Sequence, residues 1–157
     1  MIDKERLLAC LKAFNIEPSM ATFQDRKRMQ KLAYILQEVF KIDLGCGFSW
    51  YLHGPYAPNL TRMLFSMIES GETVRIQPLK GPDADIVDDA IAFLGKYSKS
   101  TEMLELLGSL DYLRKQGKAR GASDLEIIGV LKEKKPFFKD RDIALAWQKL
   151  DSVTKNH

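Results

Sequence analysis

Cysteine and histidine are scarce in this chain of 157 residues, which contains two of each. Cys10 and Cys46 are too few and too far apart for the dense framework of a disulfide-stapled protein, so a reducing, cytoplasmic setting is expected. A zinc site needs several ligands at short spacing. Only Cys46 and His53 lie near each other, since His157 ends the printed sequence. We therefore expect no metal and no other cofactor.

Long hydrophobic runs and glycine-rich phosphate loops are absent as well. No apolar stretch approaches the length that crosses a bilayer. The opening residues, MIDKERLLACLKAF, are charged from the third position onward, unlike a signal peptide. The "GCG" at 45–47 lacks the glycine, lysine and hydroxyl residue that complete a phosphate loop. The sequence thus predicts a protein without membrane association and without a nucleotide loop.

Charge of one sign is not in large excess. The formal net charge is +3, and it resides in residues 1–80, which hold 11 Lys and Arg against 8 Asp and Glu. Residues 81–157 hold 13 of each sign. Such a balance does not by itself indicate nucleic-acid binding, and any electrostatic role is expected in the first half.

What is present is mainly helical periodicity. Apolar residues recur at helical spacing over about 2–14, 22–41, 58–69, 83–97, 101–117, 123–134 and 140–153. Ser100, Ser123 and Asp140 are placed as N-caps. Two short segments, 48–52 and 73–79, have strand character, and we expect them to pair or to form a small wing.

These patterns predict a mainly α protein with a small antiparallel β element, winged-helix-like, followed by a C-terminal helical bundle portion. Residues 1–80 form a helical core with the β element and the "HGPY" turn. Residues 81–157 add helices that pack on it, and the two parts make one compact domain. The stretch "LKGPDA" marks the boundary between them.

The helix at 22–41 has an apolar stripe and a polar side. The stripe contains Met29, Leu32, Ala33, Leu36, Val39 and Phe40. The polar side is expected to carry Arg26, Lys27, Gln30, Lys31, Gln37 and Glu38, with Arg28 near the boundary. Arg26, Lys27, Arg28 and Lys31 are therefore candidates for contact with nucleic-acid phosphates. An ordinary solvated helix face is the simpler interpretation of the same charges.

The stretch "WYLHGPYAPNLTRML" at 50–64 combines aromatic rings, His53, a glycine and two prolines just before a helix. Gly54 permits backbone conformations that other residues avoid, and Pro55 and Pro58 stiffen the entry to the helix. These features favour a structural turn. The same stretch also presents a polar and aromatic patch for a partner, formed by Tyr51, His53, Tyr56, Asn59 and Arg62.

The order of these motifs resembles the SocA-like/Panacea superfamily, in particular its YwgA-like branch of small prokaryotic proteins. The residues that carry the resemblance are Lys31, Leu32, Tyr34, Leu36 and Gln37 in the helix, then Phe48, Tyr51, His53, Gly54, Pro55 and Tyr56. It covers residues 20–80 best. Ala57 departs from the family pattern, which often has serine or valine there, so a capping hydroxyl is missing.

The resemblance implies a mostly helical domain with a small β element. Some members act as antitoxins or as adaptors that deliver a toxin to a protease, and others accompany phage or defence genes. No catalytic residues carry over from it. The function expected from it is a non-enzymatic, antitoxin-like or regulatory protein-interaction module that binds a toxin or another protein. A homodimer is the other association considered.

Two alternatives remain open. The first is a winged-helix-like DNA-binding regulator, in which helix 58–69 reads the groove, although Arg62 is its one cation. The second is an enzyme that uses His53 together with Ser49 or Asp43.

Overall fold

The computed structural model describes residues 1–72 and 74–156, with side chains through residue 153. In this part of the chain the α-helices are α1 (Lys4–Ala13), α2 (Phe23–Tyr34), α3 (Pro58–Glu69), α4 (Pro82–Leu94), α5 (Thr101–Ala119), α6 (Asp124–Lys134) and α7 (Asp140–Asn156). A π-helical turn, η1 (Ile35–Val39), continues α2, and a 3₁₀ turn, η2 (Gly95–Lys99), continues α4. The predicted mainly α fold with a small antiparallel β element is confirmed.

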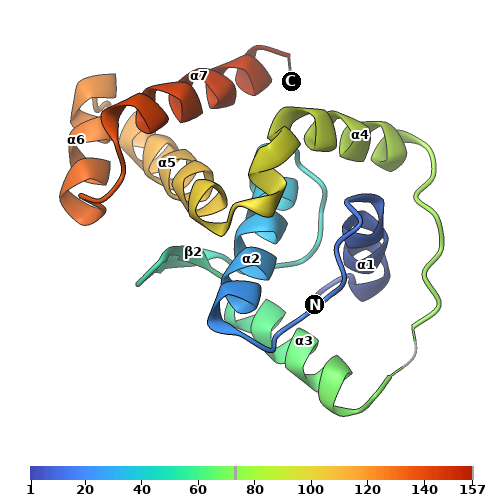
Figure 1. Ribbon diagram of the computed structural model, residues 1–157. Helices are drawn as coiled ribbons and strands as arrows, with labels where there is room; N and C mark the ends of the chain where they lie inside the picture. The colour runs from blue at the N-terminus through green and yellow to red at the C-terminus, as the bar shows by residue number, and fades with distance from the viewer. Residues whose placement is uncertain (73, 157) are drawn as a thin grey trace.

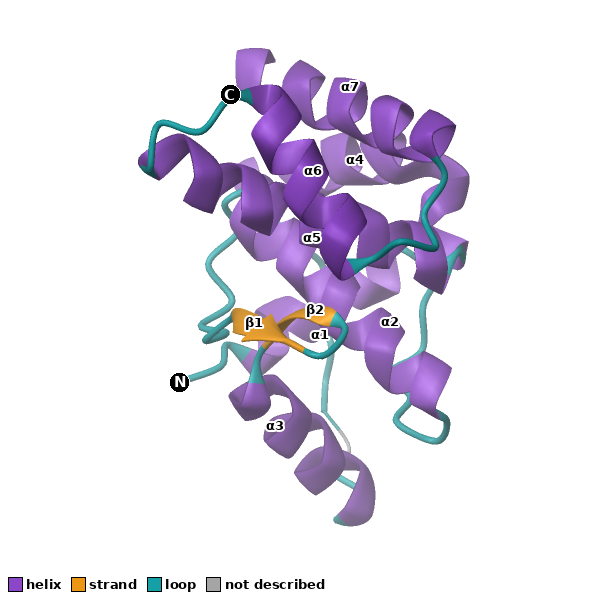
Figure 2. Ribbon diagram, turned by 90° about the vertical axis from the view of Figure 1, so that its left-hand side faces the viewer, coloured by secondary structure: helices purple, strands orange, loops and turns teal. Residues whose placement is uncertain are grey.

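The β element is a single hairpin of β1 (Ser49–Tyr51) and β2 (Gly54–Tyr56). Ser49 pairs with Tyr56, and Tyr51 pairs with Gly54, so Leu52 and His53 form the turn. The strand predicted at 48–52 thus pairs with residues 54–56, which were interpreted from the sequence as part of the "HGPY" turn. Figure 2 shows the two short strands of the hairpin between α3, below them, and α5, above them.

The predicted strand at 73–79 is wrong for residues 74–79, which form no regular element, while Thr73 lies outside the described residues. Its alternating pattern has another cause. Val74, Ile76 and Leu79 pack partly buried against the core, as an extended connection that runs from α3 to α4. Figure 1 places this connection on the opposite side of the molecule from the hairpin, so the expected wing does not form there.

Helix α2 lies in the middle of the molecule, with α3 below it and α4 above it in Figure 1. The hairpin and α5 also pack against it. Its predicted apolar stripe is buried as expected. The predicted polar side is wrong at two positions, because Gln30 and Lys31 are buried at 3% and 2% exposure. A helix covered from several directions has no fully solvated face, whatever its periodicity.

One hydrophobic core joins the helices from α1 to α7, with α5 packed against α2, α6 and α7. The predicted N-caps Ser100 and Ser123 are confirmed, since their side chains accept from the backbone N–H of Met103 and Glu126. Asp140 is instead the first residue of α7 and pairs with Lys132.

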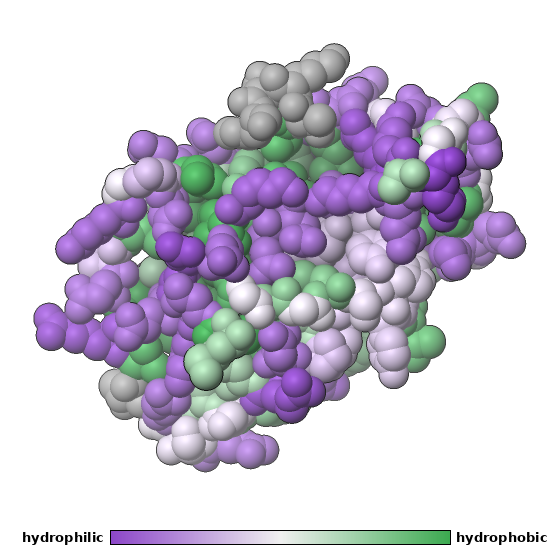
Figure 3. Space-filling model, turned by 180° about the vertical axis from the view of Figure 1, so that it is seen from behind, coloured by the Kyte–Doolittle hydropathy of each residue, from purple (hydrophilic) through white to green (hydrophobic). Residues whose placement is uncertain are grey.

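Hydrophilic side chains cover most of the face shown in Figure 3, where hydrophobic residues appear as separate patches. Among the helices described, none combines the length and apolar character needed to cross a membrane.

Gly54 gives the hairpin a close contact with α5 that can be tested. Its φ is +92°, and a Cβ placed there would lie 2.4 Å from the Ser109 Oγ atom. Gly71 also has a positive φ, +64°, but a Cβ there meets no atom within 4 Å. We expect Gly54→Ala to lower the free energy of unfolding by about 1–3 kcal/mol more than Gly71→Ala, because overpacking adds to backbone strain. Urea denaturation measures both.

The Ser109→Ala background is the control for this contact. It removes the hydroxyl that meets the new methyl group, so it should recover part of the loss in Gly54→Ala. Equal losses in Gly54→Ala and Gly71→Ala would contradict a close packing of the hairpin on α5.

Candidate functional site

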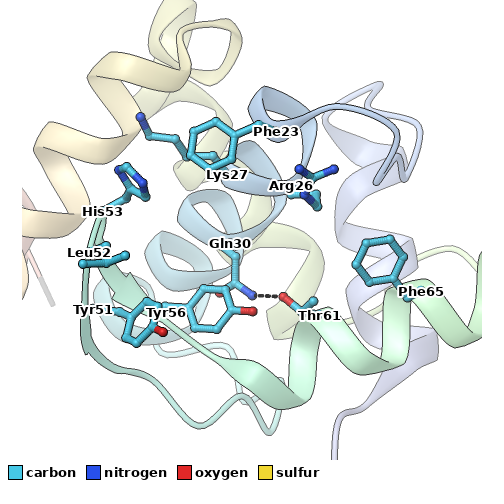
Figure 4. Close-up of a pocket in the computed structure, with 10 residues that line it drawn as sticks. All are labelled: Phe23, Arg26, Lys27, Gln30, Tyr51, Leu52, His53, Tyr56, Thr61 and Phe65. Carbon is cyan, nitrogen blue, oxygen red and sulfur yellow. Dashed lines mark hydrogen bonds between the residues drawn. The ribbon is translucent and has the colours of Figure 1, made fainter.

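A groove of about 400 Å³ opens between the beginning of α2, the hairpin turn and α3. Figure 4 shows the three walls and the side chains that face the space between them. The lining residues are Phe23, Arg26, Lys27 and Gln30 from α2, Tyr51, Leu52, His53 and Tyr56 from the hairpin, and Thr61 and Phe65 from α3. Besides His53, this set holds five apolar or aromatic side chains, and it contains no carboxylate.

Exposed apolar side chains mark the rim of the groove. Leu52 at the hairpin turn is 79% exposed, and Phe23 and Phe65 are 47% and 37% exposed. The rings of Tyr51 and Tyr56 stack with centroids 5.5 Å apart. Apolar surface of this kind, bordered by polar groups, is typical of a binding site.

Gln30 fixes the wall formed by the hairpin and α3. Its side-chain amide donates to the Ala57 carbonyl oxygen at 2.9 Å and accepts from the Ala57 N–H at 2.8 Å. The same amide nitrogen donates to Thr61 Oγ1 at 2.8 Å, as the dashed line in Figure 4 shows. The junction between β2 and α3 is thus held directly by a side chain of α2.

A buried charge cluster lies behind the hairpin. Glu105 of α5, only 2% exposed at its side chain, pairs with Lys27 at 2.5 Å and with Lys135 at 3.3 Å. The buried Lys31 ammonium donates to the Pro55 carbonyl oxygen at 2.6 Å. The Ser109 hydroxyl on α5 is buried without a hydrogen-bond partner. Three lysines therefore surround one glutamate.

Burial changes the ionisation of this region. It lowers the pKa of Lys31 to about 7, although nearby Glu105 opposes the change. Burial also lowers the pKa of His53, and the neighbouring Lys27 ammonium adds to that effect. Both effects favour the neutral imidazole of His53, which meets the Phe23 ring edge to face at a centroid distance of 5.0 Å.

The structure brings together three of the five residues proposed as a partner patch. Tyr51, His53 and Tyr56 line the groove. Asn59 instead bonds to the loop before β1, where it accepts from the Gly47 N–H and donates to the Gly45 carbonyl oxygen. Arg62 lines a shallow depression farther along α3 that shares Thr61 and Phe65 with the groove.

The four candidate phosphate contacts do not form an exposed basic stripe. Lys31 is buried and Lys27 pairs with Glu105. Arg28 donates through Nε to the Ser98 carbonyl oxygen, and Arg26 donates to the Met20 carbonyl oxygen. The expectation of Lys27 and Lys31 on a solvated polar face is therefore wrong, because α5 and the hairpin cover that face.

Catalysis by His53 would require its imidazole to contact Ser49 or Asp43. In the described part of the chain, no hydrogen bond links His53 to either residue. Cys46 is buried, and burial raises the pKa of its thiol to about 12. Within the described residues, no three His, Cys, Asp or Glu side chains gather as a possible metal site.

Several residues of this region were not singled out from the sequence. Glu105 and Ser109 interrupt the apolar run "LELLGSL" of α5, and Lys135 follows α6. A charged residue flanked by leucines on both sides is expected to be buried together with a group of opposite charge. The sequence does not identify that group, because its position depends on how α2 and α5 pack. Phe23 and Leu52 carry no signal beyond their apolar character.

Comparison of the chain with models of protein families, with curated proteins and with solved structures finds no match.

The lowered pKa of Lys31 leads to a prediction about stability. The unfolded chain keeps this lysine protonated up to about pH 10.5, whereas the folded chain releases the proton near pH 7. The unfolded state therefore binds more protons in that window, and stability contributed by this group rises with pH across it. Relative to Lys31→Met, we expect wild type to gain about 1–2 kcal/mol between about pH 7.5 and pH 9.5.

Urea denaturation of both proteins at the two pH values measures this difference. Lys80→Met is the control, because Lys80 is exposed and its removal should leave the pH dependence of wild type unchanged. Parallel pH dependence in wild type and Lys31→Met would show that Lys31 stays protonated in the folded state.

Proposed function

We propose that this protein is a non-enzymatic protein-interaction module that binds a segment of a partner protein in the groove between α2, the hairpin and α3. The observation that carries the proposal is the apolar rim of this groove, where Leu52, Phe23 and Phe65 remain exposed. Exposed large apolar side chains that converge on one concavity are typical of protein-binding sites.

The rigidity of the groove supports this role. Gln30 holds the junction of β2 and α3 through both polar atoms of Ala57, and Lys31 holds Pro55. The turn residues Leu52 and His53 are therefore presented on a hairpin anchored to a central helix. A site that is ordered before binding loses less conformational entropy when the partner arrives.

The chemistry of the rim favours a protein over DNA. Aromatic side chains such as Tyr51 and Tyr56 are common anchors of protein interfaces. DNA binding relies on several cations that reach phosphates, whereas Lys31 is buried and Lys27 is paired. The connection at 74–79 also forms no wing strand beside α3.

The finer role is part of the same proposal. The resemblance of the α2 motif and of the "HGPY" turn to the SocA-like/Panacea superfamily supports an antitoxin-like or regulatory protein, whose partner is a toxin or another protein. The groove includes Tyr51, His53 and Tyr56 of the motif that carries this resemblance.

Two exposed leucines provide a matched test. Leu52 at the groove is 79% exposed, and Leu125 on α6, outside the groove, is 82% exposed. Wild type, Leu52→Asn and Leu125→Asn are each used for affinity purification from the native host, and stoichiometric partners are identified by mass spectrometry. We expect one protein that wild type and Leu125→Asn retain and Leu52→Asn loses, with Kd raised about tenfold or more because an interface anchor is removed.

Circular dichroism melting of the three proteins checks that neither substitution unfolds the chain. Retention of the partner by Leu52→Asn at wild-type affinity would place the interface elsewhere. Recovery of nuclease-sensitive nucleic acid without a protein would favour the DNA-binding alternative.

A further inference from the structure

The charges around the groove are unbalanced in a way that bears on the partner. Lys27, Lys31 and Lys135 surround Glu105, whose two carboxylate oxygens pair with Lys27 and Lys135. Lys31 has a backbone carbonyl oxygen as its hydrogen-bond partner, and no carboxylate is within ion-pair distance of it in the described part of the chain. Within this buried cluster, one carboxylate is therefore shared by two lysines, Lys27 and Lys135.

Part of this positive charge faces the groove. Lys27 lines the wall, and its ammonium lies 5.8 Å from the centre of the Phe23 ring. Figure 4 shows Lys27 and His53 close to Phe23 on one side of the groove, with Arg26 farther along the same wall. Arg26 forms no ion pair among the described residues and bonds only to the Met20 carbonyl oxygen.

The opposite side of the groove has a different chemistry. Tyr56, Thr61 and Phe65 provide apolar and aromatic surface and two hydroxyls, of which the Thr61 hydroxyl already accepts from Gln30. A ligand complementary to both sides carries a negative charge next to an apolar side chain. Because charges interact more strongly where water is excluded, the mostly buried Lys27 discriminates between a charged and a neutral ligand group.

We propose that the segment bound in the groove is an acidic-apolar one, in which an aspartate or glutamate contacts Lys27 and His53 while an adjacent apolar side chain packs on Tyr56 and Phe65. This inference rests on the proposed function, since it specifies what the interaction groove recognises. The added carboxylate gives Lys27 a second anionic partner besides Glu105, which Lys27 shares with Lys135.

A nucleic-acid phosphate fits the same positive wall less well. A strand carries a phosphate at every nucleotide and is bound by a row of exposed cations. The groove offers Arg26 and a mostly buried Lys27, with 15% exposure at its side chain. That arrangement suits one negative charge rather than a chain of them.

A carboxylate bound in the groove also changes the pKa of His53. The groups that face this imidazole are Lys27 and Lys31 on α2, Glu105 on α5 and Lys135 after α6. An acidic side chain beside it favours the protonated imidazole, so binding raises the pKa of His53. Affinity then increases as the pH falls toward that pKa, because the complex takes up a proton.

The test uses the full chain and two capped tripeptides that differ in one group, Leu-Glu-Phe and Leu-Gln-Phe. Each is titrated into isotope-labelled protein, and NMR follows the backbone amides of Tyr51, Leu52, His53, Gly54 and Tyr56 and the imidazole of His53. We expect Leu-Glu-Phe to bind about tenfold more tightly than Leu-Gln-Phe, as a charge-assisted contact in a partly desolvated site provides. Only Leu-Glu-Phe should raise the pKa of His53.

Two variants that each remove one lysine charge test whether Lys27 causes the preference for glutamate. Lys27→Met should abolish the preference for glutamate, and Lys80→Met, which removes an exposed lysine outside the groove, should keep it. Spectra of the free variants confirm that both are folded.

Equal binding of the two tripeptides would overturn the charge inference and leave the interaction groove in place. Binding of neither would also overturn it, while the comparison of Leu52→Asn with Leu125→Asn decides independently whether the groove is an interface. Displacement of Leu-Glu-Phe by an oligothymidylate would overturn it in favour of nucleic acid.

Discussion

The burial of α2 on several sides is the constraint on which the rest of the structure depends. A central helix that carries Gln30, Lys31 and Tyr34 must satisfy their polar atoms inside the protein, because unpaired buried groups are strongly destabilising. Each of these side chains finds its partner outside α2. Gln30 bonds to Ala57, Lys31 to Pro55, and the Tyr34 hydroxyl donates to Asp111 on α5 at 2.7 Å. These contacts position the hairpin and α5 around the helix.

The same constraint shapes the groove. The hairpin is too short to be stable alone, and it is held by side chains of α2 and by the close approach of Gly54 to Ser109. Its turn therefore projects Leu52 and His53 over the beginning of α2 from a fixed base. The lysines that balance Glu105 lie just behind this turn. Apolar rim and positive wall are thus consequences of one packing arrangement, and the proposed recognition of an acidic-apolar segment follows from their proximity.

Local patterns predicted most of the secondary structure, because helix periodicity and capping act over a few residues. Ser100 and Ser123 cap their helices, and Pro58 begins α3 as its position before the apolar run indicates. The strand expected at 73–79 was wrong over 74–79, since alternation also arises when an extended segment lays every second side chain on a core. The second strand was missed because the glycine and proline in "HGPY" are typical of turns. The strand is also only three residues long, too short to show an alternating pattern.

The sequence by itself determined the helical character of this chain and placed a chain reversal and several aromatic side chains close to Gly54, since these depend on spacing and local conformation. Tertiary structure alone decided that Lys27 pairs with a buried glutamate and that the buried Lys31 ammonium donates to a backbone carbonyl oxygen. It also decided that Phe23, Leu52 and Phe65, from three separate elements, converge on one groove. The physical reason is that burial and charge pairing depend on which elements pack against α2. The helical periodicity of one segment does not say which other segments will cover it.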